Sequence, residues 1–211
     1  MINLILDCSY GMNVYLVNDG EVYSFEDKIQ NKHSDEILKV IDELLSKAKV
    51  SVKDIQNICV CVGPGSFTGV RVAVSIVKGL AIGTNAKVFA LSNFDIFDCV
   101  EKNYYLVLDG FSNFVYLRTV KNNERIDECV EIEKFVENQI NDKLKVYYTT
   151  EKTQKLLEKY EIYGEFVKNN IISAFNLKIQ NGESVNLNQI YPVYLRASQA
   201  EIEREKKKNN G

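Results

Sequence analysis

The tetrapeptide "LILD" at residues 4–7 recurs as "LVLD" at residues 106–109, about one hundred positions further along the chain. After each tetrapeptide comes a turn, and then a second apolar stretch that contains "VYL". A strand that ends in aspartate, a turn and another strand therefore occur twice. The recurrence predicts a duplicated core, in which each half of the chain builds a sheet of its own.

The composition is that of a globular protein with a core of useful size. The chain has 211 residues, of which 45% are hydrophobic and 26% are charged, and this is enough for one large domain or two small ones. The net charge of -3 argues against a dedicated nucleic-acid binder. No apolar run approaches the roughly eighteen residues of a membrane span, and no signal-peptide pattern is present. We therefore expect a cytoplasmic protein without membrane contact.

Strand and helix patterns alternate along the chain. Apolar runs predict strands at 2–8, 57–62, 87–91 and 145–150, and apolar spacing predicts helices at 35–48, 68–83, 92–102, 131–142 and 151–160. This order is typical of an α/β protein with mixed sheets. We predict an N-terminal lobe over 1–103, a reduced C-terminal lobe over 104–196 and a charged tail over 197–211.

The segment "GPGSFTGVR" (63–71) joins a predicted strand to a predicted helix. It lacks the spacing of a P-loop, of a dinucleotide-binding loop and of a nucleophile elbow. Three interpretations remain: a tight turn whose helix is capped by Ser66 or Thr68, an anion cradle at the helix N-terminus, or a catalytic loop. The residues of the candidate nucleotide or anion site are Asp7, Gly63, Gly65, Ser66, Thr68 and Gly69.

The helix predicted over 68–83 carries more apolar surface than one sheet can cover. Two apolar stripes run along it: Val70, Val74, Val77 and Ala81 form one, and Val72, Ala73, Ile76 and Leu80 form the other. Because the second stripe is bulkier, we expect it to face the core and the first to bind another chain. Burial of both stripes inside the domain is the alternative. The helix over 35–48 is predicted to add Ile37, Ile41, Leu44 and Leu45 to the partner interface.

Histidine and cysteine usage excludes several classes of site. The chain has a single histidine, His33, and five cysteines without a C-x-x-C pair. We therefore expect no metal site and no disulfide framework. Cys59 and Cys61 alternate on a predicted strand, so they should be buried thiols on one face of a sheet. The sequence shows no Ser–His or Cys–His pattern typical of a protease, although His33 could lie near a distant serine in the folded chain.

Five segments resemble one family in the order in which they occur. "GPGSFTGVRVAVSIVKGLA" (63–81) resembles the signature segment of the TsaB (YeaZ) family of tRNA threonylcarbamoyladenosine biosynthesis proteins. The supporting segments are "LILDCS" (4–9), "HSDEILKVIDELL" (33–45), "VLDGFSNFVY" (107–116) and "YPVYLR" (191–196). The resemblance covers residues 2 to 196, and the glycine-rich segment is its most specific part.

The resemblance implies the actin-like ATPase fold of sugar kinases, Hsp70 and actin, with two related lobes. It implies a non-catalytic activating subunit that works with TsaD and TsaE in threonylcarbamoyl transfer to adenosine 37 of tRNAs that read ANN codons. TsaD would carry the metal and the chemistry, and TsaE is a small ATPase. The first two helices would form the pairing surface, in a homodimer or with TsaD. The resemblance implies that this subunit has no tightly bound cofactor, although ATP or ADP could bind at the interface of the complex. It also implies that the chain contacts tRNA only indirectly, through the complex.

Three positions depart from the family pattern. Cys8 stands where a threonine is usual, and Phe111 and Phe114 replace an arginine and a glutamate. Loss of this charged pair weakens the case for nucleotide chemistry in the isolated chain. Two other functions stay open as alternatives. One is an autonomous actin-like nucleotide-dependent enzyme that uses Asp7 and the loop over 63–69, and the other is a protease.

Overall fold

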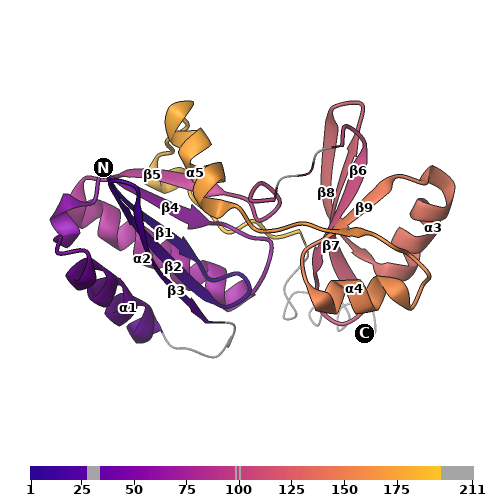
Figure 1. The fold of residues 1–211 in the computed structure, drawn as a ribbon, viewed down its shortest axis with the longest axis horizontal. Helices are drawn as coiled ribbons and strands as arrows, with labels where there is room; N and C mark the ends of the chain where they lie inside the picture. Colours follow the sequence, from indigo (N-terminus) through magenta and orange to yellow (C-terminus); the bar gives the residue numbers. More distant parts are fainter. Residues whose placement is uncertain (28–33, 98, 100, 196–211) are drawn as a thin grey trace, which may run out of the picture. The chain divides into compact units, whose positions relative to one another are not determined.

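The protein consists of two compact units. The computed structural model describes residues 1–27, 34–97, 99 and 101–195, drawn in Figure 1. The first unit contains Met1–Ile96 and Asn170–Val193, and the second contains Phe97–Asn169 and Tyr194–Gly211. The chain thus returns to the first unit after residue 169, whereas the predicted lobes are continuous in sequence. The predicted tail over 197–211 lies outside the described residues.

The first unit is built on a mixed five-stranded sheet. Its strands are β1 (Ile2–Asp7), β2 (Met12–Asn18), β3 (Glu21–Asp27), β4 (Asn57–Cys61) and β5 (Lys87–Leu91). Their order is β3-β2-β1-β4-β5. The hairpin strands β1, β2 and β3 pair antiparallel, and β4 and β5 continue the sheet in parallel with β1.

The second unit repeats this plan. Its strands are β6 (Tyr104–Asp109), β7 (Phe114–Lys121), β8 (Glu124–Glu131), β9 (Lys145–Tyr148) and β10 (Glu165–Phe166). The order β8-β7-β6-β9-β10 matches the first sheet strand for strand, with the same antiparallel and parallel pairs. The duplication predicted from the two tetrapeptides is confirmed. The architecture is an α/β fold with mixed sheets in two related halves.

Among its described residues, the first unit also contains three helices and two short 3-10 turns. They are α1 (Ser34–Lys47), α2 (Phe67–Thr84), α5 (Ile171–Gln180), η1 (Val52–Asp54) and η2 (Leu187–Gln189). Helix α1 packs on β2 and β3, and α2 packs on β1, β4 and β5. Helix α5 lies on the other side of the sheet (Figure 1), where the Phe175 ring meets Phe89 edge-on at 5.3 Å. Cys59 and Cys61 are both buried, as predicted.

In the second unit the helices α3 (Ile132–Asp142) and α4 (Glu151–Glu158) connect the strands. Tyr105, Phe135 and Leu157 form the centre of its core. Both helices were predicted from the sequence. The helix predicted over 92–102 is wrong in the part that the structure describes: residues 93–96 form turns, and Phe97 makes an isolated bridge with Asn169.

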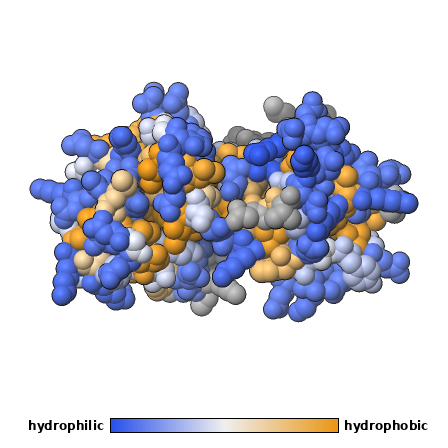
Figure 2. All heavy atoms as spheres, turned by 45° about the horizontal axis from the view of Figure 1, so that its top comes forward, coloured by the Kyte–Doolittle hydropathy of each residue, from blue (hydrophilic) through white to orange (hydrophobic). Residues whose placement is uncertain are grey.

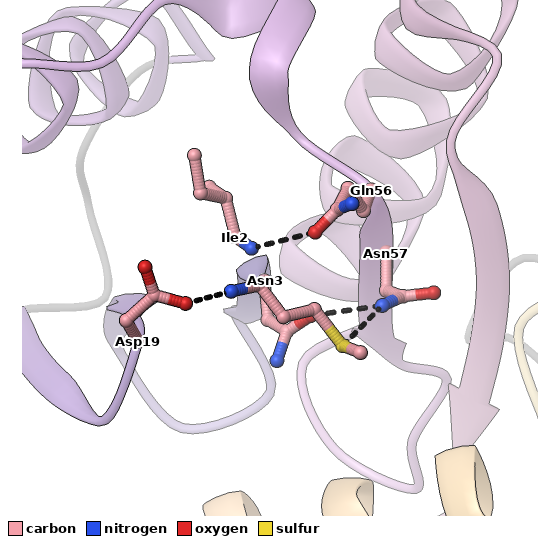
Figure 3. Close-up of polar contacts among 6 residues, drawn as sticks. Ile2, Asn3, Asp19, Gln56 and Asn57 are labelled. Atoms are coloured by element: carbon pink, nitrogen blue, oxygen red, sulfur yellow. Dashed lines mark hydrogen bonds and ion pairs between the residues drawn. The ribbon is translucent and has the colours of Figure 1, made fainter.

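A buried amide pair sets the register of the two central strands of the first sheet. Asn3 and Asn57 are register partners on β1 and β4, and both are 6% exposed. The Asn57 side chain donates to Asn3 Oδ1 at 2.9 Å (Figure 3). Nearby, the backbone N–H of Ile2 donates to Gln56 Oε1 at 3.1 Å. Because buried amides need partners, a slip of one residue would be costly, and the carboxyl ends of β1 and β4 are therefore held level.

The predicted assignment of the two stripes of α2 is wrong. Val70, Val74, Val77 and Ala81, expected to face outward, are at most 5% exposed and pack in the first unit's core. In the second stripe, Ala73 is buried as predicted, whereas Val72, Ile76 and Leu80 are only partly buried. Small side chains let the helix axis approach the sheet closely, so the bulkier residues lie on its flank. The outward side of α2, here called the outer face, carries Val72, Ser75, Ile76, Gly79 and Gly83.

The residues of α1 that were expected at a partner interface are also buried in the core. Ile37, Ile41, Leu44 and Leu45 are at most 5% exposed and face the sheet. The apolar arc of α1 is therefore used within the unit, as in any amphipathic surface helix. Neither set of predicted interface residues is available on the surface of this chain.

The surface of the molecule mixes apolar and polar side chains. On the face drawn in Figure 2, orange apolar residues lie in patches among hydrophilic ones. Helix α2 is long and apolar enough to cross a membrane by length and composition. One row of its side chains nevertheless packs on the sheet of the first unit, and core helices of globular proteins commonly have this composition.

The burial of Val74 leads to a stability prediction. Val74→Glu should lower the free energy of unfolding by about 3 kcal/mol or more, because it places an unpaired carboxylate in the core. The neighbouring change Ser75→Glu adds the same charge on the outer face and should shift stability by no more than about 0.5 kcal/mol. Chemical denaturation followed by circular dichroism measures both. A Val74→Glu protein as stable as wild type would contradict the buried position of this helix row.

Candidate functional site

The candidate site lies at the carboxyl edge of the first sheet. Asp7 is the last residue of β1, and the glycine-rich loop over 62–66 follows β4 directly. In open α/β sheets, ligands bind at this edge, where loops leave the parallel strands. The structure therefore brings together the aspartate and the loop that the sequence singled out.

Asp7 is buried and its carboxylate is already hydrogen-bonded. It is 3% exposed. Its Oδ1 accepts from the backbone N–H of Ser9 at 2.9 Å and from the Ser9 hydroxyl at 2.5 Å, and the Asn13 side chain is a further donor. Burial raises the pKa of Asp7, and these hydrogen bonds lower it in part. All three donors are neutral, so they do not balance the charge of the carboxylate.

The glycine-rich loop is packed against the residues that follow Asp7. Gly63 has φ +101°, a conformation that favours glycine. A Cβ on Gly65 would lie 2.6 Å from Ser9 Cβ, and one on Gly69 would overlap the carbonyl oxygen of Cys8. Gly63 is thus needed for its backbone conformation, while Gly65 and Gly69 are needed for close approach.

Ser66 is the N-cap of α2. Its hydroxyl accepts from the backbone N–H of Gly69 at 3.2 Å, and its own backbone N–H donates to Ser9 O at 2.8 Å. Thr68 is exposed and does not cap the helix. Of the two predicted caps, Ser66 is therefore the one that the structure confirms. Backbone carbonyl oxygens of Cys8 and Ser9 lie against the start of α2, where an anion cradle would place the oxygens of a phosphate.

Asn93 holds the other side of the loop. It is 1% exposed and follows β5. Its side-chain amide donates to Pro64 O at 2.6 Å, and its backbone N–H donates to Gly63 O at 2.8 Å. A buried side-chain amide that satisfies a loop carbonyl acts as a clamp. The sequence gives no signal for this role, because the contact joins residues 29 positions apart.

The second unit contains a counterpart of Asp7. Asp109 ends β6, and its Oδ1 accepts from the hydroxyl of Thr150 at 2.7 Å and from that of Thr153. Thr150 is also the N-cap of α4, through the backbone N–H of Thr153 at 3.1 Å. The carboxylate of Asp109 therefore anchors the start of a helix inside its own unit.

The two phenylalanines that depart from the family pattern lie just beyond Asp109. Phe111 is 70% exposed at the turn between β6 and β7. Phe114 begins β7, and its carbonyl oxygen lies so close to Gly110 that a Cβ there would overlap it. The hairpin tip is thus tightly folded and presents an apolar ring at the position where the resemblance implies a charged side chain.

The thiols near the site are buried. Burial, followed by the charge of Asp7, raises the pKa of Cys8 to about 12, and burial raises the pKa values of Cys59 and Cys61 strongly. These cysteines are protonated at neutral pH and are poor nucleophiles. His33 lies outside the described residues. Within the part of the chain that the structure describes, no group of three or more histidine, cysteine or acidic residues could hold a metal ion.

A family model described as "TsaD: tRNA N6-adenosine threonylcarbamoyltransferase" matches residues 27–134, just over half of the chain. Curated relatives that match are named tRNA threonylcarbamoyladenosine biosynthesis protein TsaB. The Haemophilus influenzae relative is 37% identical over 91 residues, and the Escherichia coli relative is 35% identical over 80 residues. The chain belongs to the TsaB (YeaZ) family.

The match to these TsaB relatives is partial in length. The match to the Haemophilus protein covers 43% of this chain and 39% of that protein. The match to the Escherichia protein covers 38% of this chain and 35% of that protein.

Solved structures match over a longer range. YeaZ from Pseudomonas aeruginosa superimposes with a TM-score of 0.72 at 22% identity, covering 92% of this chain and 99% of that one. A second Pseudomonas aeruginosa structure, described as similar to peptidase YEAZ, gives 0.75 at 23% identity with the same coverage. The YeaZ fold therefore extends through both units.

The close packing of Gly69 leads to a test with an internal control. Gly69→Ala should lower the free energy of unfolding by about 2 kcal/mol or more, since the new methyl group meets the Cys8 backbone. Gly79→Ala on the same helix meets nothing within 4 Å and should raise stability by up to about 1 kcal/mol. Equilibrium denaturation of both proteins checks the pair. Equal effects of the two substitutions would show that the loop does not pack on β1.

The burial of Asp7 predicts a pH dependence. Burial raises the pKa of Asp7 in the folded protein above the ordinary value of 3.8. The folded state therefore holds the Asp7 proton more tightly than the unfolded state does. This stabilisation is fully present below pH 3.8 and is lost as the pH rises through the folded-state pKa. Asp7→Asn keeps an oxygen that accepts from Ser9 but removes the buried charge. Thermal melts between about pH 4 and about pH 8 compare the melting temperatures of the variant and the wild type. The variant should become more stable relative to the wild type as the pH rises. A variant that is less stable than wild type at pH 8 would mean that a cation balances Asp7.

Proposed function

We propose that this protein is a non-catalytic activating subunit in tRNA threonylcarbamoyladenosine synthesis. It acts in the cytoplasm with a TsaD-like transferase and a TsaE-like ATPase. The complex transfers the threonylcarbamoyl group to adenosine 37 of tRNAs that read ANN codons. The transferase supplies the chemistry, and this chain contacts the tRNA only through the complex. ATP or ADP, where bound, lies at the interface between subunits.

The state of the two strand-end aspartates carries this proposal. Asp7 and Asp109 end the first strand of each half and would be the groups to hold a metal-bound nucleotide in an active relative of this fold. Here Asp7 accepts from Ser9, and Asp109 accepts from Thr150 and Thr153. Both carboxylates are thus used for internal structure, which supports a subunit without chemistry of its own.

The outer face of α2 supports a role in assembly. Gly79 and Gly83 are exposed, and a Cβ added to either would meet nothing within 4 Å. Glycine inside a helix costs about 1 kcal/mol relative to alanine, and no contact within the described chain requires it here. Together with Val72 and Ile76 on the same face, the glycines suit a partner helix whose backbone approaches closely. We propose that this face, in place of the buried stripe predicted from the sequence, binds the transferase or a second copy of the chain.

An autonomous nucleotide-dependent enzyme is the second candidate function. The observation in its favour is the buried charge of Asp7 beside neutral donors only, since uncompensated carboxylates at a sheet edge are typical of functional sites. Calorimetric titration of the isolated chain with Mg-ATP tests it. Micromolar binding with turnover would favour the enzyme over the activating subunit.

Reconstitution tests the proposed function directly. The chain alone should form no threonylcarbamoyladenosine on tRNA, and it should support synthesis when the transferase, the ATPase, ATP and the threonylcarbamoyl donor are added. Gly79→Leu should weaken binding to the transferase at least about tenfold, or about 1.4 kcal/mol, without lowering the melting temperature. Asn176→Leu, a change at another exposed position, on α5, serves as the control and should bind normally. Full activity of the isolated chain would reject the proposal.

A further inference from the structure

The segment that follows α5 contacts the start of the glycine-rich loop. The backbone N–H of Val193 donates to Val62 O at 2.7 Å. The carbonyl oxygen of the same residue lies 3.2 Å from the position that a Cβ on Gly63 would take. Val62 and Gly63 come directly after β4. The backbone of Val193 therefore packs on the point where the loop leaves the sheet.

Residues 187–193, here called the strap, are attached to the first unit by few contacts. Ile190 is 1% exposed and lies in the core, and it is the only buried residue of the strap, all of which the structure describes. Leu187 packs against the core while partly exposed, and the Lys78 ammonium lies 4.8 Å from the centroid of the Tyr191 ring. Segments with few buried apolar contacts open at a lower free energy than the whole domain. We therefore expect the strap to open before the sheet does.

The other contacts of the loop come from residues that follow strands of the sheet. Asn93, which follows β5, donates to the carbonyl oxygens of Gly63 and Pro64. The carbonyl oxygen of Ser9, which follows β1, accepts from the backbone N–H of Ser66. Detachment of the strap would leave these contacts in place and take away the donor that the strap gives to the loop. The loop would thus be released at its start, where glycine permits many backbone conformations.

The strap also continues directly into the second unit. Val193 is the last residue of the strap and of the first unit, and Tyr194 belongs to the second unit. A displacement of the chain at Tyr194 therefore acts on the hydrogen bond from Val193 N to Val62 O. Local opening of one segment can couple two parts of a chain that are far apart in sequence.

We propose that the strap is a conformational switch for the glycine-rich loop. In the closed state, Ile190 lies in the core and Val193 holds the start of the loop. In the open state, Ile190 leaves the core, the hydrogen bond to Val62 O is broken, and the loop samples several conformations at Gly63. This inference goes beyond the proposed function and does not depend on a partner at α2.

Hydrogen exchange of the full-length chain, followed by mass spectrometry, tests the switch. Ile190→Ala removes most of the buried side chain that keeps the strap closed, so amide exchange in the strap should become at least about thirtyfold faster. Exchange at residues 63–66 of the loop should become faster by the same factor, because both segments exchange through the same opening. Exchange in β6 and β7 of the second unit should not change.

Ile41→Ala is the matched control. Ile41 is 2% exposed in the same core, but it lies on α1, which packs on β2 and β3. This variant should lower the global stability of the first unit and leave exchange in the strap and the loop within about twofold of wild type. If Ile41→Ala accelerates exchange in the strap as much as Ile190→Ala does, the strap opens only with the whole unit and the switch is rejected. If Ile190→Ala accelerates the strap but not the loop, the strap does not control the loop and the proposal is wrong.

A smaller truncation keeps the test decisive if circular dichroism shows that Ile190→Ala is unfolded. Ile190→Val removes a single methyl group from the core and should accelerate exchange in the strap and in the loop by about fivefold. Acceleration of the strap alone would again overturn the switch.

Discussion

The contact between the glycine-rich loop and the end of β1 determines much of the first unit. Gly65 and Gly69 admit the backbone of Cys8 and Ser9 at distances that no side chain would allow. This contact fixes the start of α2 and its rotation about its own axis, and Asn93 secures the loop from β5. The row of α2 that is buried, and the row that is left exposed, both follow from that rotation.

The two halves of the fold meet the same requirement by different chemistry. In each half a helix must begin next to the aspartate that ends the first strand. The first unit uses a backbone donor, from Ser66 to Ser9 O, and lets Ser9 saturate Asp7. The second unit uses the hydroxyls of Thr150 and its neighbour to bind Asp109 directly. The two sheets thus have the same topology but different local contacts. Strand order determines which chain segments lie next to each other, but it does not determine which side chains form the hydrogen bonds between them.

The sequence predicted the duplicated architecture because the two aspartate-ended strands and their helices are local patterns. For the same reason it placed Asp7 beside the glycine-rich loop, and it offered Ser66 as one of two possible caps of α2. It assigned the stripes of α2 wrongly, since a helical wheel orders side chains around an axis but does not say which side meets the sheet. It also missed α5 and the return of 170–193 to the first unit: "IISAFNLKIQ" has little periodicity, and its partner Phe89 is far away in sequence. The use of the outer face by a partner stays a prediction.

The two open glycines of α2 also bear on how this chain could be engineered. A helix shaped only by the stability of its own subunit would be expected to drift toward alanine at Gly79 and Gly83, because space is available and each change is favourable by up to about 1 kcal/mol. Under the proposed binding of a partner at the outer face, these two glycines serve the assembled form rather than the stability of the free subunit. Stabilising substitutions chosen from the isolated chain would therefore select against the protein's own role, and thermostability screens of the free subunit would favour variants that no longer assemble.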